Sequence, residues 1–427
     1  MYPSGPEPHS LPHPQIHSFN FPEVSLGTGG MQHDPAAVLF LTIGIILLLI
    51  KFRMHVGYSV VTGALILILF TLPTEDVLHI ITKTASSGAT LTLLLLIYSV
   101  LLLSYTMESA GMLSRLAGSL TAIGGRLTLI AVPLLIGLLP MPAGALVSAM
   151  MLSGVVKEHG ISREEATFAN YWFRHLWIPT WPLYPAFIIT LGVAEINPAE
   201  LIKINLPLTI AALFAGLLLL RRELHLSGAS HEPRAVRGLA GSIWPILAII
   251  LLTLVAGVAL ILSILLVLLL TILLTRPPLP ELKKALRRAL DPRMGVLIYG
   301  VLLFRNGIEA SGAAARVMEL LSSQALPVAA VAMILSFLVG FAVGIEMAPP
   351  SIALPLFISF VGRGDAVVSE HLLLIFTAGY LGVQLSPMHL CFTVTADYFS
   401  ASISKVYRLL TVAGAVTLLI VAAGVLL

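Results

Sequence analysis

Long apolar stretches separated by short polar segments dominate the chain. Residues 38–50 and 247–274 contain almost no polar side chains. Continuous apolar runs of this kind are typical of helices inside a membrane, whereas a membrane β-barrel has short segments of alternating polarity. The pattern therefore predicts an all-α polytopic membrane protein.

The same pattern predicts three kinds of membrane element. Helices that cross the bilayer are expected over residues 36–50, 56–72, 88–107, 201–220, 243–256, 258–275, 294–308 and 407–427. Two hairpins are expected over residues 127–156 and 327–361. Two crossings interrupted by proline or polar residues are expected over residues 164–192 and 371–399.

The second hairpin has arms that are short for a membrane crossing. Residues 335–360 place Glu346, Pro349 and Pro350 between two apolar arms. An arm of about 12 residues covers about 18 Å of a hydrocarbon core about 30 Å thick. The chain is therefore expected to enter, break and leave on one side, and irregular backbone at that depth must line a cavity or be buried in protein.

Composition agrees with a membrane location. The 427 residues are 58% hydrophobic and 11% charged, with a net charge of +3 and a single cysteine, Cys391, that is expected to serve packing. Of 24 Lys and Arg residues, 18 fall in segments that are cytoplasmic if the N-terminus is outside, and this excess is typical of the inner side of a membrane. We therefore expect a multi-pass protein of the cytoplasmic membrane with its N-terminus outside.

The chain divides into five expected parts. Residues 1–35 form a tail rich in Pro, His, Gly and Ser, which predicts disorder rather than a signal peptide, and its histidines His9, His13, His17 and His33 are not interpreted as a metal site. Membrane helices at 36–87 follow, then a first repeat unit at 88–220, cytoplasmic loops with a connecting hairpin at 221–293, and a second repeat unit at 294–427. The basic helix within residues 279–293 is expected either to lie on the inner leaflet or to be solvated.

An internal repeat links the two halves. Residues 98–115 match residues 299–316 without a gap, and seven of the 18 positions are identical, including Glu108 with Glu309 and Gly111 with Gly312. Five crossings separate the starts of the two units, and an odd number inverts the second copy. Inverted repeats with paired broken elements are typical of secondary transporters, which bind substrate near the membrane midplane.

Three motifs carry a resemblance to a known family. The tips PMPAG (140–144) and IEMAPPS (345–351), with the late segment LSPMHLCFTVTADYFSAS (385–402), resemble an uncharacterised prokaryotic integral-membrane family of the ion transporter superfamily. That superfamily includes divalent-anion/sodium symporters and citrate, gluconate and arsenite carriers. The resemblance implies a homodimer with two re-entrant hairpins, two discontinuous helices and an elevator mechanism. The Ser-Asn-Thr tip motif of sodium-coupled dicarboxylate carriers is absent, so sodium coupling does not follow.

Helix ends and polar side chains at the breaks indicate the site. Helices that start near Gly144, Pro350, Pro182 and Pro387 would direct their N-termini inward, which suits an anion. A carboxylate such as Glu346 is unfavourable by about 3 kcal/mol in the membrane interior, so it is expected to carry a proton, bind a cation or pair with an arginine. The predicted substrate- and ion-binding residues are Glu346, Pro349, Pro350, Ser351, Pro142, Gly144, Ser148, Thr180, Ser386, Pro387, His389, Asp397, Asn170, Arg174 and His175.

Several of these residues have a structural alternative. The serines would instead bond to their own helices, Asp397 would sit at a cytoplasmic helix end, and Arg174 would reach the membrane interface beside Trp172 and Trp177. Arg305 is expected to pair with Glu309, one turn further along the same helix.

The sequence favours a secondary active transporter of a small, anionic, carboxylate-type solute coupled to protons or sodium. A sodium/proton antiporter and a non-transporting receptor or scaffold remain alternatives. The nucleotide-binding motif G-x-x-x-x-G-K-[ST] is absent, as are H-E-x-x-H and G-x-S-x-G, so neither ATP hydrolysis by that loop nor an intramembrane enzyme is expected. We expect no cofactor other than H⁺ or Na⁺ as a coupling ion, no metal site, and lipid rather than nucleic acid as a partner.

Overall fold

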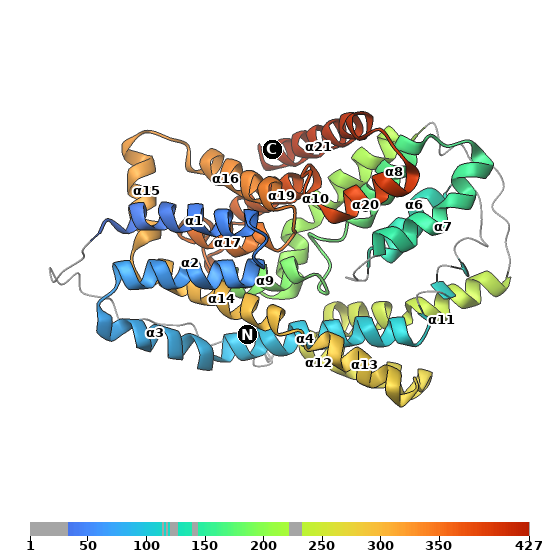
Figure 1. Ribbon diagram of the computed structural model, residues 1–427, viewed down its shortest axis with the longest axis horizontal. Coiled ribbons are helices and arrows are strands. Elements are labelled where there is room, and N and C mark those ends of the chain that lie inside the picture. The colour runs from blue at the N-terminus through green and yellow to red at the C-terminus, as the bar shows by residue number, and fades with distance from the viewer. Residues whose placement is uncertain are drawn as a thin grey trace, which may run out of the picture. The chain divides into compact units, whose positions relative to one another are not determined.

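The computed structural model describes residues 33–112, 115–116, 118–119, 127–138, 144–221 and 233–426. Within these residues the regular secondary structure is entirely helical (Figure 1). The membrane crossings expected from the sequence correspond to α1 (Pro35–Lys51), α2 (Val56–Thr71), α4 (Gly88–Ser109), α10 (Pro198–Leu219), α11 (Pro233–Ile250) with η1 (Leu251–Val255), α12 (Leu260–Thr275), α14 (Pro292–Ala310) and α21 (Ile403–Leu426).

The expected hairpins and interrupted crossings appear as pairs of shorter helices. The hairpins are α6 (Thr128–Ile136) with α7 (Gly144–His159), and α16 (Val328–Val343) with α17 (Ala348–Leu356) and α18 (Ile358–Val361). The interrupted crossings are α8 (Arg163–Arg174) with α9 (Pro185–Ala194), and α19 (Ser369–Gln384) with α20 (Leu390–Phe399). A short 3₁₀ turn, η2 (Gly364–Ala366), precedes α19.

Three described helices are long and apolar enough to cross a membrane by length and composition: α4, α10 and α21. Their 22 to 24 residues reach about 33–36 Å, which exceeds the hydrocarbon core of about 30 Å. The 9 to 12 residues of α8, α9, α17 and α20 reach only about 14–18 Å. Four helices therefore end well before they could span a bilayer.

Local sequence explains several helix starts. Asp34 and Asp291 each accept a hydrogen bond from the backbone two residues on, and a proline follows each at the first helical position. Ser87 and Asn197 accept from the third residue on, at the starts of α4 and α10. Such caps satisfy amides that have no partner inside the helix, and proline there loses no hydrogen bond.

Close backbone contact joins α16 to α19, the most extensive helix pair in the described structure. A Cβ on Gly382 would lie 2.2 Å from the Phe337 carbonyl oxygen, and one on Gly340 would lie 2.5 Å from that of Gly379. Ser336 Oγ donates to the Ile375 carbonyl at 2.9 Å. Small residues that allow such contact, with a hydroxyl bridging the helices, are a common way to hold membrane helices together.

The segments matched by the internal repeat have the same local structure. Both α4 and α14 end at a glycine in the left-handed region, Gly111 and Gly312, each with φ of 67°. The amides of these glycines donate to Glu108 and Glu309 carbonyls, which occupy equivalent positions. Glycine takes this conformation without the strain that a Cβ would introduce, which explains its place at both helix ends.

The expected Arg305–Glu309 pair is wrong. Arg305 Nη1 instead lies 2.8 Å from a carboxylate oxygen of Glu195, which follows α9, and donates to the Gly192 carbonyl at 2.6 Å. Glu309 pairs with Arg363 at 2.7 Å. The carbonyl end of α9 attracts a cation more strongly than a neighbour on the same helix, because the helix dipole and a carboxylate act together there.

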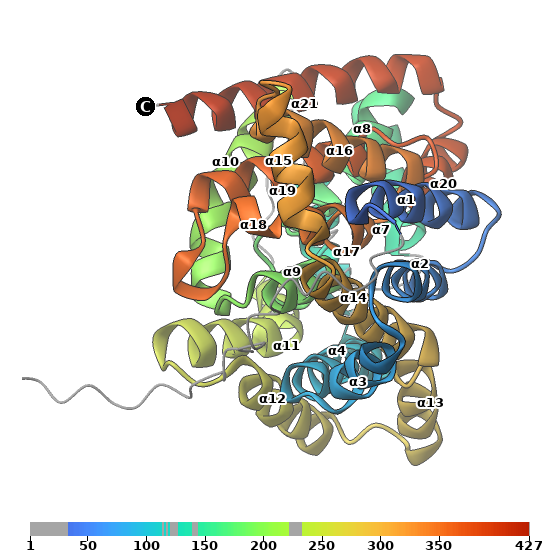
Figure 2. The same ribbon diagram turned by 90° about the vertical axis from the view of Figure 1, so that its left-hand side faces the viewer.

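Two helices were not expected from the sequence, and a third is placed differently. The helices α3 (Thr74–Ser86) and α15 (Ala313–Ser323) are amphipathic and too polar to register as crossings. The basic helix α13 (Leu279–Ala289) packs on α4, beside which Figure 2 shows it, and its Ala285 and Ala289 are buried. The helix therefore has a protein partner and is not a plain solvated loop.

Candidate functional site

Two helix breaks meet one another and the hairpins. The first runs through residues 175–184, between α8 and α9, and the second through residues 385–389, between α19 and α20. A third break, residues 344–347, separates α16 from α17 and contains Glu346. The tip between α6 and α7, which includes Pro142 and Met141, lies outside the described residues.

The first break covers the carbonyl end of α6. Trp177 Nε1 donates to Leu134 O at 2.8 Å, Trp181 Nε1 to Leu138 O at 2.7 Å, and the Tyr184 hydroxyl to Gly137 O at 2.6 Å. These carbonyls have no partner inside the helix. Aromatic side chains of the break therefore satisfy the end of the hairpin's first arm.

The second break covers the carbonyl end of α16 in a similar way. Ser386 Oγ donates to Phe341 O at 2.6 Å and accepts from the Met388 amide at 3.1 Å. Gly344, with φ of 67°, sits so close that a Cβ there would lie 2.8 Å from the His389 nitrogen. In the first half Gly137 is tighter still, since a Cβ there would lie 2.2 Å from the Arg174 carbonyl oxygen.

A buried polar cluster lies where the two breaks approach. His175 Nε2 is 3.2 Å from His389 Nε2, and Arg174 Nη1 is 3.5 Å from His175 Nε2. Arg174 Nη1 also lies 3.3 Å from the sulfur of Cys391. Arg174, His175 and His389 are 5%, 3% and 4% exposed, so this cationic site is deep inside the protein.

Residues of α8 hold this cluster to the other elements. Asn170 Nδ2 donates to Ala145 O of α7 at 2.9 Å and to Thr395 Oγ1 of α20 at 3.0 Å. The Tyr171 hydroxyl donates to the carbonyls of Val383 and Gln384, at 3.2 and 3.1 Å, at the end of α19. One helix therefore contacts a hairpin arm and both sides of the second break.

The alternative in which Arg174 reaches the membrane interface does not agree with the structure. Arg174 is buried, and Trp172 is fully buried with its Nε1 donating to Ala212 O at 2.9 Å. Trp177 is likewise engaged with α6. A side chain reaching for the membrane surface would be exposed, so Arg174 is an interior cation.

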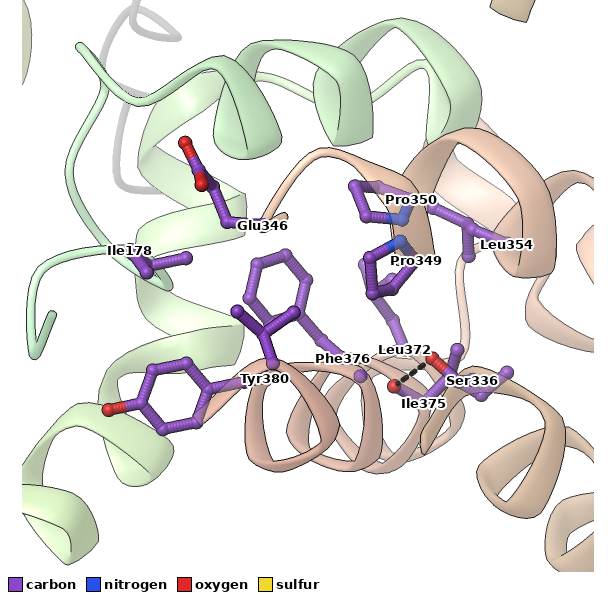
Figure 3. A pocket seen from close by; sticks show the side chains of 12 residues that line it. Ile178, Ser336, Glu346, Pro349, Pro350, Leu354, Leu372, Ile375, Phe376 and Tyr380 are labelled. Carbon is purple, nitrogen blue, oxygen red and sulfur yellow. Dashed lines mark hydrogen bonds between the residues drawn. The ribbon is translucent and has the colours of Figure 1, made fainter. Parts of the chain in front are cut away.

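Glu346 lines a small, partly open pocket. Figure 3 shows its carboxylate and the Tyr380 hydroxyl toward the side of Ile178, with Ser336 and the two prolines on the other side. In the described structure Glu346 has no ion pair within 4 Å, although it interacts electrostatically with Arg174. The lining residues are Ile178, Ser336, Glu346, Pro349, Pro350, Leu354, Leu372, Ile375, Phe376, Gly379, Tyr380 and Val383.

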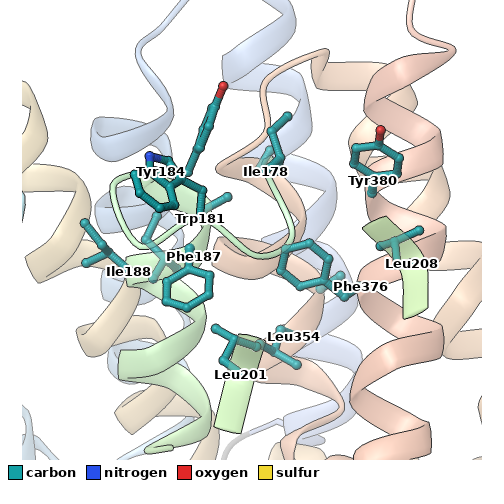
Figure 4. Close-up of a cluster of buried hydrophobic side chains, with 14 of the residues drawn as sticks. Ile178, Trp181, Tyr184, Phe187, Ile188, Leu201, Leu208, Leu354, Phe376 and Tyr380 are labelled. Atoms are coloured by element: carbon teal, nitrogen blue, oxygen red, sulfur yellow. The ribbon is translucent and has the colours of Figure 1, made fainter. Parts of the chain in front are cut away.

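An apolar cluster closes the site on the side of α9 and α10. Figure 4 shows the hydroxyls of Tyr184 and Tyr380 pointing the same way, out of a group that includes Phe187, Leu201 and Leu354. Apolar side chains exclude water and so strengthen electrostatic interactions in the polar region beside them.

The start of α17 offers fewer donors than a helix N-terminus usually does. Pro349 and Pro350 have no N–H, and the amides of Ala348 and Ser351 donate to Ile345 O and Met347 O. The Ser351 and Ser148 hydroxyls donate to their own helices, to Met347 O at 2.6 Å and Gly144 O at 3.0 Å. An anion near Glu346 would therefore depend on Arg174 rather than on α17 for its hydrogen bonds.

The remaining predicted residues lie at separate places. Thr180 Oγ1 is 3.1 Å from Thr209 Oγ1 of α10. Pro387 is within the second break. Asp397 is exposed in the last turn of α20, and no described contact joins it to Glu346. Sequence reasoning missed Tyr171, Trp181 and Tyr184, although the positions of Trp181 and Tyr184 directly before prolines were a signal.

Comparisons with known proteins support a membrane-transporter fold. The solved structure titled "Crystal structure of the Alcanivorax borkumensis YdaH transporter reveals an unusual topology" matches with a TM-score of 0.57 and 15% identity, over 92% of this chain and 98% of that one. At this identity the likeness concerns the fold. No curated protein matches. Residues 35–427 match the family described as "Protein of unknown function (DUF401)", and the chain belongs to that family.

Proposed function

We propose that this protein is a secondary active transporter of a small anionic, carboxylate-type solute, coupled to protons or sodium. The observation that carries the proposal is a buried arginine, Arg174, between two broken helices and in electrostatic range of Glu346, a carboxylate with no ion pair among the described residues. A buried guanidinium is suited to binding a carboxylate. Glu346 is the residue we assign to the coupling ion.

Features of the fold support transport by an inverted repeat. Gly111 and Gly312 end equivalent helices with the same φ, and a glycine of each hairpin, Gly137 or Gly344, packs closely against backbone at or beside a break. Paired broken elements of this kind are typical of secondary transporters. We propose re-entrant hairpins, an elevator movement and a homodimer in the cytoplasmic membrane.

One observation favours a second candidate, a sodium/proton antiporter. Glu346 has no ion pair in the described structure, so it is available to carry a cation itself. In that case Arg174 would tune the site rather than bind a substrate.

Thermal stability of the purified protein separates the candidates. A ligand that binds the native state raises the melting temperature by mass action. The panel comprises mono-, di- and tricarboxylates, phosphate and sulfate, each with and without sodium at two pH values. We expect a carboxylate to raise the Tm in a sodium- or pH-dependent way, and Glu346→Gln to remove that dependence.

The exposed carboxylate Glu370, in the first turn of α19, provides the matched control Glu370→Gln. This variant should keep the full ligand response. Tm shifts with sodium or pH and none with any anion would support the antiporter. No response to any ligand, together with no solute flux into liposomes, would reject both in favour of a receptor or scaffold.

A further inference from the structure

Three side chains with metal-ligating atoms converge where the two helix breaks meet, and transport of an anion gives no role to one of them, Cys391. His175, His389 and Cys391 each offer one ligand atom, and these atoms all lie within 4.8 Å of one another. The cysteine was expected to serve packing alone. Its place beside two buried imidazoles instead indicates a role as a metal ligand.

The distance between the imidazoles fits a shared metal ion. The two Nε2 atoms are 3.2 Å apart. Two zinc–nitrogen bonds of about 2.05 Å that end at such a pair enclose an angle of about 103°, which is close to tetrahedral. The pair therefore needs little rearrangement to bind one ion.

The ring of His175 is already oriented for this role. Its Nδ1 lies 2.6 Å from the Tyr171 carbonyl oxygen, which only accepts, so Nδ1 carries the proton and Nε2 presents its lone pair to the cluster. Metal-binding histidines are commonly fixed by such a bond to a backbone carbonyl.

Arg174 faces the same position. Its Nη1 lies 3.5 Å from His175 Nε2 and 3.3 Å from the Cys391 sulfur, so one cationic group faces two of the three ligand atoms. A metal ion and the guanidinium would compete for the same electron pairs. Arg174 also interacts electrostatically with the Glu346 carboxylate.

The three ligand atoms differ in burial. Cys391 is partly exposed, and its neighbours Met388 and Leu390 are 65% and 74% exposed. The sulfur therefore lies on the more exposed side of the cluster, and the two imidazoles lie on the buried side.

We propose that His175 Nε2, His389 Nε2 and Cys391 Sγ form a binding site for a borderline-soft transition-metal ion of the Zn²⁺ class. Imidazole and thiolate together favour such ions over Mg²⁺ or Ca²⁺, which prefer oxygen ligands. Three protein ligands leave a fourth position for water or another small ligand. The ion joins α8 to α20 and holds the two breaks together.

Cobalt titration of the full-length protein tests the site. The protein carries a histidine-free affinity tag, and His9, His13, His17 and His33 are replaced by Gln in every sample so that the tail contributes nothing. After treatment with a chelator, Co²⁺ is added and absorbance recorded. We expect one equivalent bound per chain, intense visible bands of four-coordinate Co²⁺ and a near-ultraviolet thiolate-to-cobalt band, all abolished by Zn²⁺.

Variants assign the ligands. Cys391→Ser should lose the thiolate band, and His175→Gln and His389→Gln should each weaken binding by more than about tenfold, since loss of even an outer-shell partner has that effect. The control His371→Gln removes a histidine stacked on Phe360, and should bind as the parent does. Absence of the thiolate band in the parent, or unchanged affinity in the histidine variants, would overturn the proposal.

A second readout covers variants that fold poorly. Zn²⁺ should raise the Tm of the parent and not that of Cys391→Ser, whose side chain is nearly the same shape. Equal Zn²⁺ shifts in both proteins would reject the site. Because no transported solute is present, this result is independent of the proposed transport function.

Discussion

At the residue scale, two buried arginines differ in what surrounds them. Arg305 contacts the Glu195 carboxylate, the Gly192 carbonyl and Asn306 Oδ1, and Asn306 in turn donates to Thr84 Oγ1 at 2.9 Å. Arg174 Nη1 instead lies 3.5 Å from an imidazole nitrogen and 3.3 Å from a thiol sulfur, and the guanidinium also interacts electrostatically with Glu346. The carboxylate partner of Arg305 indicates a structural role, whereas Arg174 lies among the other polar residues of the candidate site.

The Glu195–Arg305 pair yields a stability prediction. Removing one partner of a buried ion pair leaves the other charge poorly compensated, which destabilises by about 3 kcal/mol or more for full burial. Because the Glu195 side chain is 24% exposed, we expect about 2 kcal/mol for Glu195→Gln, measured as a lower Tm in detergent. Glu319 pairs with Arg316 at an exposed position and provides the control. Glu319→Gln should leave the Tm unchanged. Equal Tm values for the two variants would contradict this account.

Arg174 yields a binding prediction. Arg174→Gln keeps much of the side-chain volume but removes the charge, so it should abolish any carboxylate-dependent rise in Tm while the ligand-free protein still folds. Arg305→Gln should show the opposite pattern: a lower starting Tm with the ligand response retained in the folded fraction. The Tm panel with and without carboxylate measures both. A full carboxylate response in Arg174→Gln would remove this residue from the site.

At the element scale, glycines decide how closely the breaks approach the hairpins. Gly344 and Gly312 both have φ of 67°, but they differ in their surroundings. A Cβ added at Gly344 would lie within 3 Å of backbone atoms of the second break, whereas one at Gly312 would meet nothing within 4 Å. The two positions therefore share the conformational penalty of a side chain and differ in the steric one. Substitutions at the two glycines therefore measure how much the close approach of the hairpin to the second break contributes to stability.

Alanine at these glycines should separate the two penalties. Gly312→Ala should destabilise by about 1 kcal/mol, because only the backbone conformation is unfavourable. Gly344→Ala should destabilise further and also weaken ligand binding, since His389 must move. Chemical or thermal denaturation in detergent measures both changes. If Gly344→Ala behaved like Gly312→Ala, the contact between the hairpin and the second break would not be required.

The sequence predicts these elements unevenly, for physical reasons. Proline and polar residues inside apolar runs locate the breaks to within a few residues, because they interrupt helices wherever the chain folds. Contacts between residues that are distant in the sequence are predicted less well. Local spacing favoured Glu309 for Arg305, but the end of α9 lies nearer. The two prolines that remove donors from α17 were visible in the sequence, and their consequence for an anion site follows from covalent structure alone.

At the scale of the whole molecule, ion pairs between distant segments agree with two separate membrane faces. Arg316 lies 3.6 Å from Asp34 and Arg363 lies 2.7 Å from Glu309, and the distribution of basic residues assigns all four segments to the outside. Lys405 lies 3.9 Å from Glu164 and Arg288 lies 3.2 Å from Glu108, among segments assigned to the cytoplasm. Charges that are distant in the sequence therefore group by predicted side.

Cysteine labelling in intact cells tells the two sides apart. With Cys391→Ser removing the only native cysteine, Asp365→Cys and Lys283→Cys place single thiols at exposed positions in η2 and α13. Short basic loops stay in the cytoplasm, so an impermeant maleimide should label position 365 directly and position 283 only after permeabilisation. The reverse result would invert the whole protein without changing its fold. Labelling of both positions from one side would break the link between the charge pattern and the two groups of ion pairs, and with it the span count on which the inverted repeat depends.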